Sequence, residues 1–350
     1  MAEVVGPGGT VGILGGGQLG RMLAIAAAQL GLKAHVYCPE ADPPAGDVSV
    51  AITTGTYNDA TRLAAFAASV DVVTYEFENV PAETVDILEP LVPVRPGRAA
   101  LAAAQDRVAE KDFLNTAGAP TAPYAAVDDM ASLEAALDKI GAPAILKTRR
   151  LGYDGKGQAR IMARADAGGA LSAMNGAPAV LEGFVDFRRE LSVIAARGAD
   201  GDIRCFDPGE NVHKDGILRR TTVPCGPPNE AFDIAARIVS ALDYVGVIGV
   251  ELFDTGGGLL VNEIAPRVHN TGHWTIEACA VDQFQQHIRA ICGWSLGSPA
   301  RHSDSEMTNL IGDDADDWAT LDGALHLYGK GEARPGRKMG HVTRLSAKTS

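Results

Sequence analysis

The first hundred residues alternate short apolar runs with amphipathic stretches. An apolar run at residues 10–14 breaks into a glycine-rich loop that an amphipathic stretch follows, which predicts a strand, a loop and a helix. Further strands are predicted at residues 33–38 and 70–75, with an Ala-rich helix at 61–68 between them. Strands that alternate with helices favour a parallel sheet covered on both faces. The Pro- and Arg-rich residues 93–98 mark the end of this unit.

The pattern changes after residue 100 or so. Helices at residues 106–114 and 132–140, and strands at 144–147 and 158–162 on either side of a glycine-rich loop, predict a small α+β unit.

Beyond residue 179 the apolar runs have a mostly antiparallel character. They predict strands at 190–195, 203–206, 247–253 and 259–264, and a long helix at 232–242. We therefore expect an α/β protein, α+β in parts, that begins with a Rossmann-like parallel sheet. Its three expected domains are residues 1–99, 100–181 and 182–350.

Composition narrows the class of protein. The chain has 350 residues, of which 46% are hydrophobic and 21% charged, so it can bury a large core and is not disordered. Its net charge of -13 argues against a nucleic-acid or membrane partner, and any bound phosphate must be met by local cations, backbone N–H groups or a metal. Scattered cysteines, with neither a secretory leader nor an 18-residue apolar run, lead us to expect a soluble, cytoplasmic protein.

The first glycine loop allows several interpretations. Gly15, Gly17 and Gly20 match the dinucleotide-binding fingerprint, and Glu40 lies where a ribose-binding acid would follow. Free N–H groups at a helix start nevertheless attract any phosphate or carboxylate. The bulky Gln18 at the tip disfavours a pyrophosphate, so NAD, another anion and a purely structural turn all remain open.

A second glycine loop follows a lysine. Lys147 closes a buried apolar strand, and residues 152–158 supply three glycines whose backbone N–H groups can face a polyphosphate. The loop is not a Walker A motif, because no Lys-Ser or Lys-Thr follows a G-x-x-x-x-G frame. An ordinary hairpin with glycine turns is the alternative.

Two glutamates flank a third glycine-rich turn. Glu251 and Glu263 are equidistant from Gly257, so a hairpin centred there places two like charges opposite each other, where they repel. A divalent cation removes that conflict, and with Asn262 the pair supplies the hard oxygen ligands that Mg²⁺ takes when it also binds phosphates. The alternative is that one glutamate pairs with Arg267 and no metal binds.

A basic cluster lies near the end of this acidic chain. It consists of Lys330, Arg334, Arg337, Lys338 and His341. Such a run is often a solvated turn, but in a protein of this net charge it is also a reasonable receptor for a phosphorylated substrate.

Taken in order, these motifs resemble the ATP-grasp enzymes, and most closely the ATP-dependent ligases that carboxylate aminoimidazole ribonucleotide in purine biosynthesis. The segments that carry the resemblance are residues 15–23, 75–79, 152–158, 262–270 and 334–341. The resemblance implies a three-domain ATP-grasp fold, in which the second domain is the lid and the third carries the metal site and a substrate-phosphate clamp. It also implies a homodimer that uses ATP, Mg²⁺ and bicarbonate, forms carboxyphosphate and transfers its carboxyl group to the exocyclic amine of the ribonucleotide.

The resemblance also assigns residues to roles. Those that would bind ATP are Arg107, Lys147, Gly152, Tyr153, Asp154, Gly155, Lys156, Gly157, Gln158, Glu182, Gly183, Phe184, Val185, Glu190, His213, Asn262 and Glu263. Those that would bind the ribonucleotide or bicarbonate are Gln18, Leu19, Glu76, Arg267, His269, Asn270, Lys330, Arg337 and Lys338. Glu251 and Glu263 would hold Mg²⁺. The expected catalytic residues are Asp154, as acceptor of the amine proton, with Tyr153, Lys156 and Arg267.

Two alternatives are weighed against this interpretation. A related enzyme, such as a formate-using glycinamide ribonucleotide transformylase or a biotin carboxylase, would share the ATP and metal residues but use another acceptor. The Gln18-Leu19 tip, the Tyr153-Asp154 pair and residues 267–270 favour the imidazole ribonucleotide. An NAD-dependent dehydrogenase would use the first glycine loop only, and it leaves the paired glutamates without a role.

Overall fold

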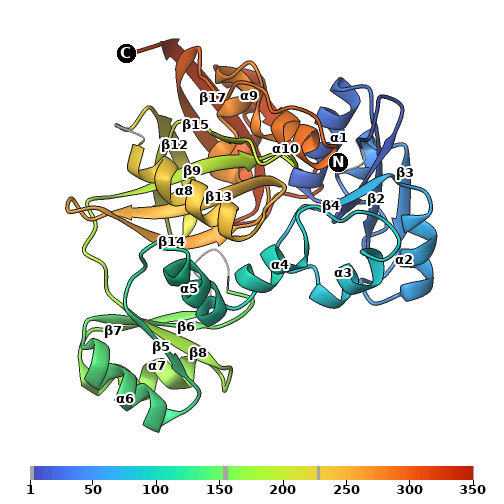
Figure 1. The fold of residues 1–350 in the computed structure, drawn as a ribbon. Helices are drawn as coiled ribbons and strands as arrows, with labels where there is room; N and C mark the ends of the chain where they lie inside the picture. Colours follow the sequence, from blue (N-terminus) through green and yellow to red (C-terminus); the bar gives the residue numbers. More distant parts are fainter. Residues whose placement is uncertain (1–3, 153–156, 227–228, 350) are drawn as a thin grey trace.

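The computed structural model describes residues 4–152, 157–226 and 229–349, which form three sheets with helices packed on them (Figure 1). The first sheet has four parallel strands in the order β3-β2-β1-β4. Its strands are β1 (Thr10–Leu14), β2 (Lys33–Cys38), β3 (Ala51–Thr54) and β4 (Val72–Tyr75), and its helices are α1 (Gln18–Gln29), η1 (Gly46–Val48), α2 (Ala60–Ala67) and α3 (Ala82–Leu88). Neighbouring residues of β1 pack on opposite faces of the sheet. Ile13 packs in one core with Leu23 of α1, and Leu14 packs in another with Leu63 of α2. The predicted parallel sheet with two covered faces is therefore confirmed.

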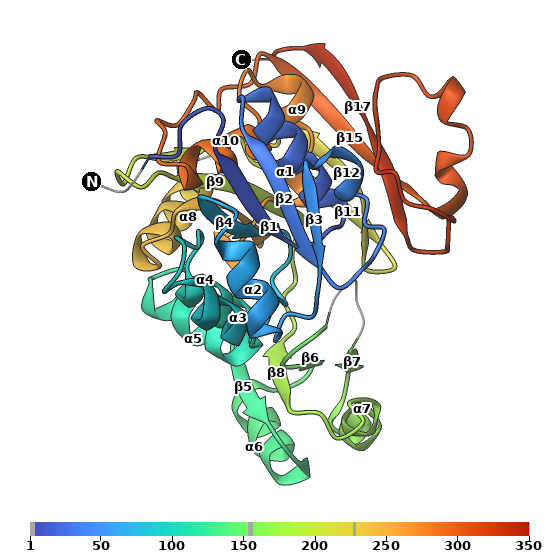
Figure 2. The same cartoon turned by 90° about the vertical axis from the view of Figure 1, so that its right-hand side faces the viewer.

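The second sheet is small and antiparallel, in the order β5-β8-β6-β7. It consists of β5 (Tyr124–Val127), β6 (Ala144–Thr148), β7 (Gln158–Ile161) and β8 (Ala179–Gly183), with α6 (Met130–Ile140), η2 (Arg164–Asp166) and α7 (Ala167–Ala173). Leu133 of α6 packs with Leu146 and Leu181 in a separate core. Helices α4 (Arg98–Ala104) and α5 (Arg107–Thr116) lie between this sheet and the rest of the molecule (Figure 1). In Figure 2 the small sheet projects below the other two, and we call it the lid.

The third sheet contains nine of the described strands, in the order β14-β13-β9-β11-β12-β15-β17-β16 with β10 beside β9, and its pairs are antiparallel. The strands are β9 (Arg189–Arg197), β10 (Ile203–Cys205), β11 (Gly209–Lys214), β12 (Ile217–Val223), β13 (Gly246–Asp254), β14 (Leu259–Ala265), β15 (Ser303–Ile311), β16 (Ala324–Leu327) and β17 (Lys338–Ala347). The helices are α8 (Asn229–Ala241), η3 (Asn270–Gly272), α9 (Thr275–Ala278), α10 (Gln283–Ile291), η4 (Gly312–Ala315) and η5 (Trp318–Thr320). Val193 packs in a core with α8, whereas its neighbour Ile194 packs in a core with α10.

The pattern missed several strands for a physical reason. Strands β11, β12 and β17 carry charged or polar residues at alternate or consecutive positions, so their apolar runs are short. They are held by pairing to distant strands, as when Thr221 of β12 pairs with Met307 of β15. Helix α5 begins one residue after the expected start, because the Asp106 carboxylate caps it by accepting the N–H groups of Val108 and Ala109 at 3.0 and 3.3 Å.

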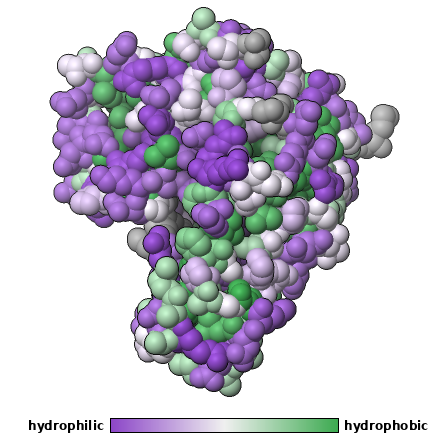
Figure 3. All heavy atoms as spheres, turned by 90° about the vertical axis from the view of Figure 1, so that its left-hand side faces the viewer, coloured by the Kyte–Doolittle hydropathy of each residue, from purple (hydrophilic) through white to green (hydrophobic). Residues whose placement is uncertain are grey.

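The face that Figure 3 shows, seen from the left of Figure 1, carries mostly polar side chains. Apolar residues gather in the middle of this face and on the lower lobe. Among the helices in the described ranges, none combines the length and the apolar character needed to cross a bilayer.

Candidate active site

A cleft with a cavity of about 500 Å³ lies where the lid, the third sheet and the start of α1 meet. Most of the expected site residues line it: Gln18, Leu19, Arg107, Lys147, Gly152, Gly157, Gln158, Glu182, Gly183, Phe184, Val185, Glu190, His213, Glu251, Asn262, Glu263, Arg267, His269, Asn270 and Lys338. Glu76, Lys330 and Arg337 are not in its lining. Tyr153, Asp154, Gly155 and Lys156 lie outside the described residues, although Gly152 and Gly157 on either side of them line the cavity.

One end of the cavity is apolar and suits a flat ring. Phe187 stacks on Phe253 with ring centres 4.7 Å apart, and Ile145 and Leu218 also line this cavity. The sequence analysis missed all four, because isolated apolar residues on different elements carry no local signal. Glu190 and His213 lie in the same cavity, and their carboxylate and imidazole approach to 2.6 Å.

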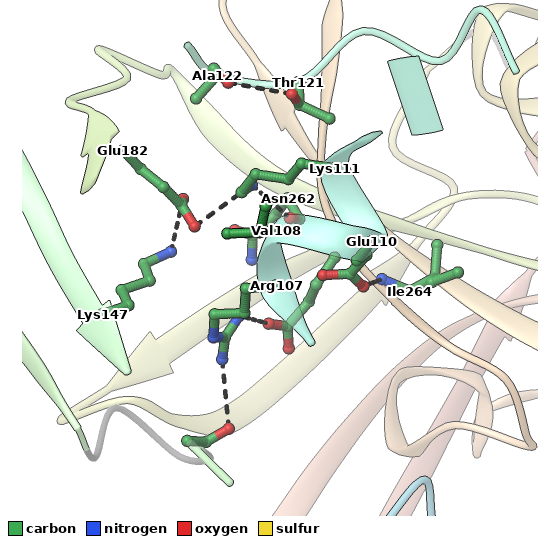
Figure 4. Close-up of polar contacts among 12 residues, drawn as sticks. Arg107, Val108, Glu110, Lys111, Thr121, Ala122, Lys147, Glu182, Asn262 and Ile264 are labelled. Atoms are coloured by element: carbon green, nitrogen blue, oxygen red, sulfur yellow. Dashed lines mark hydrogen bonds and ion pairs between the residues drawn. The ribbon is translucent and has the colours of Figure 1, made fainter. Parts of the chain in front are cut away.

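A buried glutamate holds two lysines beside this end. The Lys147 ammonium donates to Glu182 Oε2 at 2.9 Å, and Lys111 Nζ lies 3.4 Å from Glu182 Oε1 (Figure 4). Burial alone would raise the pKa of Glu182, but the two lysines outweigh it and the pKa is lowered. A side chain expected to bind ATP thus faces two cations. Lys111 was missed because a charged residue on a predicted helix is ordinarily expected to be solvated.

Glu251 and Glu263 lie opposite each other as expected, but the strand register that places them there differs from the expected one. Glu251 pairs with Glu263 across β13 and β14, whereas Asp254 faces Leu259, which centres the turn between Gly256 and Gly257 rather than on Gly257. The register shifts by one residue beyond Leu252, because Asn262 is the extra residue of a β-bulge. The bulge, and not the symmetry of the turn, brings the two carboxylates together.

The ion pairs around the two glutamates differ from the metal-free alternative, in which one glutamate pairs with Arg267. Glu263 is paired with Arg107, whose Nη1 lies 2.8 Å from Oε2, and not with Arg267. No arginine in the described part of the chain forms an ion pair with Glu251. Burial, together with the charge of Glu263, raises the pKa of Glu251. His269 Nε2 lies 3.3 Å from Glu251 Oε1. Two carboxylates and a nearby amide are hard oxygen ligands of the kind that Mg²⁺ takes when phosphate oxygens complete its shell. No group of three or more metal-binding side chains occurs among the described residues.

The expected catalytic residue Arg267 is held by Glu78, an acid within the motif at residues 75–79 to which the sequence analysis gave no role. The Arg267 guanidinium donates from Nε to Glu78, which comes from the N-terminal unit. Burial opposes the charge of Glu78, but the neighbouring Arg267 lowers the pKa of this carboxyl to about 2. His269 is mostly shielded from solvent beside the same cation, and this lowers its pKa to about 3. Asn270 is 8% exposed, and neither its side-chain nitrogen nor its oxygen has a hydrogen-bond partner within the described ranges, which leaves both able to bind a ligand.

The start of α1 is already occupied by the chain's own carboxylate. Glu76 accepts the N–H of Gly17 and, at 2.6 Å, that of Gly20. A side chain on Gly15 would collide with Glu76, which explains a glycine at that position. The Glu76 carboxylate thereby occupies the anion site of the first glycine loop, so the dinucleotide interpretation is wrong. Gln18, at the tip of the loop, lines the cavity.

The basic cluster is split by the fold. Lys338 lines the cavity, and Lys330 donates to the Lys338 carbonyl at 2.8 Å and also contacts Gln18. Arg337 donates to the Glu332 carbonyl at 2.8 Å.

The expectation for His341 was wrong. It is fully buried and stacked on His326 with ring centres 4.7 Å apart, and burial lowers its pKa well below the usual range, so it is no part of a positive patch. Arg334, by contrast, has an exposed side chain.

Family comparisons agree with this geometry. The ribonucleotide synthetase preATP-grasp domain matches residues 9–105, the ATP-grasp domain matches 112–284, and the phosphoribosylaminoimidazole carboxylase C-terminal domain matches 305–350.

Relatives match over nearly the whole chain. The N5-carboxyaminoimidazole ribonucleotide synthase of Brucella melitensis is 52% identical, covering 98% of this chain and 98% of its own. The solved Staphylococcus aureus N5-carboxyaminoimidazole synthetase with ADP has a TM-score of 0.94 at 36% identity, over 98% of this chain and 95% of that one. The Aspergillus clavatus synthase in complex with ADP and aminoimidazole ribonucleotide has a TM-score of 0.91 at 32% identity, over 97% and 94%. The chain therefore belongs to the N5-carboxyaminoimidazole ribonucleotide synthases, ATP-dependent ligases of the ATP-grasp family.

Proposed function

We propose that this chain converts aminoimidazole ribonucleotide, bicarbonate and ATP into N5-carboxyaminoimidazole ribonucleotide, ADP and phosphate, through carboxyphosphate and with Mg²⁺. One observation carries the assignment of the site. A single cavity is lined by the paired acids Glu251 and Glu263, by Lys147 for phosphates, and by the polar residues Arg267 and Asn270. A nucleotide and a phosphorylated acceptor can therefore meet without leaving the cleft.

The nucleotide lies between the lid and the third sheet in this proposal. Adenine lies against Phe184 and Val185, and the ribose hydroxyls bind Glu190, whose carboxylate is held by His213. Arg107 and Lys147 bind the phosphates, together with the backbone of residues 152–158. The complete proposed set is that of the sequence analysis, with Gly152, Gly157, Gln158, Glu182, Gly183, Asn262 and Glu263 in the cavity wall.

Glu251 and Glu263, with Asn262 beside them, would hold Mg²⁺, which when bound neutralises charge on the transferring phosphoryl group. A bicarbonate oxygen attacks the γ-phosphorus as the bond to ADP breaks, and Arg107 and Lys147 stabilise the charge that develops. The lid excludes water from the carboxyphosphate.

The ribonucleotide binds from the N-terminal side. Gln18 and Leu19 contact it with Glu76 behind them, and Lys338, supported by Lys330 and Arg337, binds its 5′-phosphate. The amine nitrogen attacks the carboxyl carbon, the bond from that carbon to the phosphate oxygen breaks, and the amine proton passes to Asp154, which Tyr153 orients. Arg267, with His269, Asn270 and Lys156, stabilises the departing phosphate.

The proposal is tested by ADP release from purified protein with Mg-ATP, in four assays that contain both, either or neither of bicarbonate and aminoimidazole ribonucleotide. We expect rapid release only when both are present, with formation of the carboxylated ribonucleotide. Release that does not depend on the ribonucleotide would contradict the assigned acceptor. Asp154→Asn should lower carboxylation while it spares nucleotide binding, and unchanged turnover would rule Asp154 out as the proton acceptor.

Three further assignments are part of this proposal. Residues 1–99, 100–181 and 182–350 act as acceptor-binding, lid and metal-binding domains, respectively. The protein is a cytoplasmic homodimer, which light scattering on the purified chain tests directly. A single-chain mass at micromolar concentration would contradict the dimer.

A further inference from the structure

Helix α5 presents three charged side chains to three consecutive residues of β14 (Figure 4). Arg107 binds the Glu263 carboxylate at 2.8 Å, and Glu110 accepts the Ile264 N–H at 2.8 Å. Lys111 lies 3.4 Å from the carbonyl oxygen of Asn262. Positions i, i+3 and i+4 share one face of a helix. This face of α5 therefore binds β14 at its bulge, beside the proposed metal ligand Glu263.

Lys111 is the deepest of these groups. Its side chain is 1% exposed, and the two polar contacts of its ammonium with described residues, to the Asn262 carbonyl and to Glu182, are each 3.4 Å long. A fully buried ammonium with two long contacts is unusual, because desolvation of a charge is costly unless a partner compensates it. The partner is Glu182, which presents one carboxylate oxygen to Lys111 and the other to Lys147.

Two cations share one buried anion in this arrangement. Lys111, Lys147 and Glu182 carry a net charge of about +1, which an incoming phosphate can neutralise. If Lys147 turns toward a phosphate, however, Glu182 loses its 2.9 Å contact and would be left buried and uncompensated. Removal of one partner from a buried ion pair is strongly destabilising, so a second cation is needed at Glu182.

We propose that Lys111 is a positioning residue that retains the charge of Glu182 when Lys147 moves to the nucleotide phosphates. Lys111 thereby lets Lys147 leave Glu182 without exposing an unpaired buried charge. The same ammonium contacts the backbone beside Glu263, so it couples the lid lysine to β14, the strand that carries Glu263. This inference rests on the proposed role of Lys147 as a phosphate ligand.

The test uses Lys111→Met, which keeps length and apolar volume but removes the charge. We expect the Kd for Mg-ATP, measured by calorimetry on the full chain, to rise at least tenfold, together with the KM for ATP. The KM for the ribonucleotide should change less than threefold. Lys139→Met is the matched control, because Lys139 is exposed on α6, and it should bind Mg-ATP as the wild type does.

A purely structural lysine would give a different result in a double variant. In Lys111→Met with Glu182→Gln, the anion that needs Lys111 is gone, so the double variant should bind Mg-ATP within threefold of Glu182→Gln alone. A double variant that binds at least tenfold more weakly than Glu182→Gln would overturn the proposal, as would a Lys111→Met variant with unchanged affinity. If Lys111→Met does not fold, the comparison of the double variant with Glu182→Gln decides. Failure of the wild type to bind Mg-ATP would instead refute the proposed function.

Discussion

Glu78→Gln is expected to loosen Arg267 without changing the size of the side chain at position 78. The carboxylate of Glu78 has its pKa lowered from 4.5 to about 2, chiefly because the neighbouring Arg267 outweighs the effect of burial. At 1.36 kcal/mol per unit, a difference of about 2.5 units corresponds to about 3 kcal/mol of stability at neutral pH. Glutamine resembles the protonated acid, so the variant should lose about this amount.

The assay is urea unfolding at pH 7 in parallel with steady-state kinetics. We expect the free energy of unfolding to fall by about 3 kcal/mol and turnover to fall roughly tenfold or more, because Arg267 loses the partner that orients it at the reacting centre. The Kd for Mg-ATP should stay within threefold, since the partner of Glu78 is Arg267 and not Arg107 or Lys147, the proposed ligands of the ATP phosphates. The control is Glu83→Gln, which makes the same change on an exposed helix position and should alter stability by less than about 0.5 kcal/mol.

Two results would contradict this reasoning. If Glu78→Gln unfolds within about 1 kcal/mol of the wild type, the ion pair does not stabilise the charged form as its geometry implies. If stability falls but turnover does not, Glu78 is structural and Arg267 needs no orientation from it.

Three other changes test separate parts of the molecule. His287 is buried with a pKa of about 3, below its ordinary 6.5, so the folded state loses stability as the pH falls below 6.5; the wild type should therefore lose about 2 kcal/mol more than His287→Gln between pH 7.5 and 5 in urea unfolding. Glu251→Gln or Glu263→Gln should each abolish the rise in thermal midpoint that Mg-ATP produces in the wild type, as should EDTA, and a retained shift would contradict the metal assignment. Lys338→Met should raise the KM for the ribonucleotide at least tenfold and leave that for ATP unchanged, whereas Arg334→Met at an exposed position should alter neither.

Local signals carried much of the prediction. The strand, glycine loop and helix at the N-terminus were recognisable because apolar periodicity and glycine are local properties, and the observed β1 and α1 lie where expected. The hairpin of β13 and β14 was found in the same way, since the glycine turn and two apolar runs are adjacent in the chain. The pairing of Glu251 with Glu263 was predicted from symmetry, yet it depends on a bulge at Asn262 that no residue pattern announced.

The charged residues that were missed share one feature, which is an interaction partner far away in the chain. Glu78 binds Arg267 across 189 residues, and Lys111 contacts Asn262 across 151. A charged residue on a predicted helix or loop is ordinarily expected to be solvated, so nothing local separates these from the exposed ones. The burial of His341 beside His326 is of the same kind, because a histidine in a basic run was expected at the surface.

By itself, the sequence determined the types of the clearest local elements and, through its ordered motifs, the chemistry to expect, since propensity, turns and glycine conformations act within a few residues. The tertiary structure alone decided which charges are buried together, which of the basic residues reach the cavity, and that Glu76 fills the anion site of the first glycine loop. The physical reason is that desolvation and ion pairing depend on what surrounds a charge in space. Those surroundings come from strands and helices that meet only when the chain has folded.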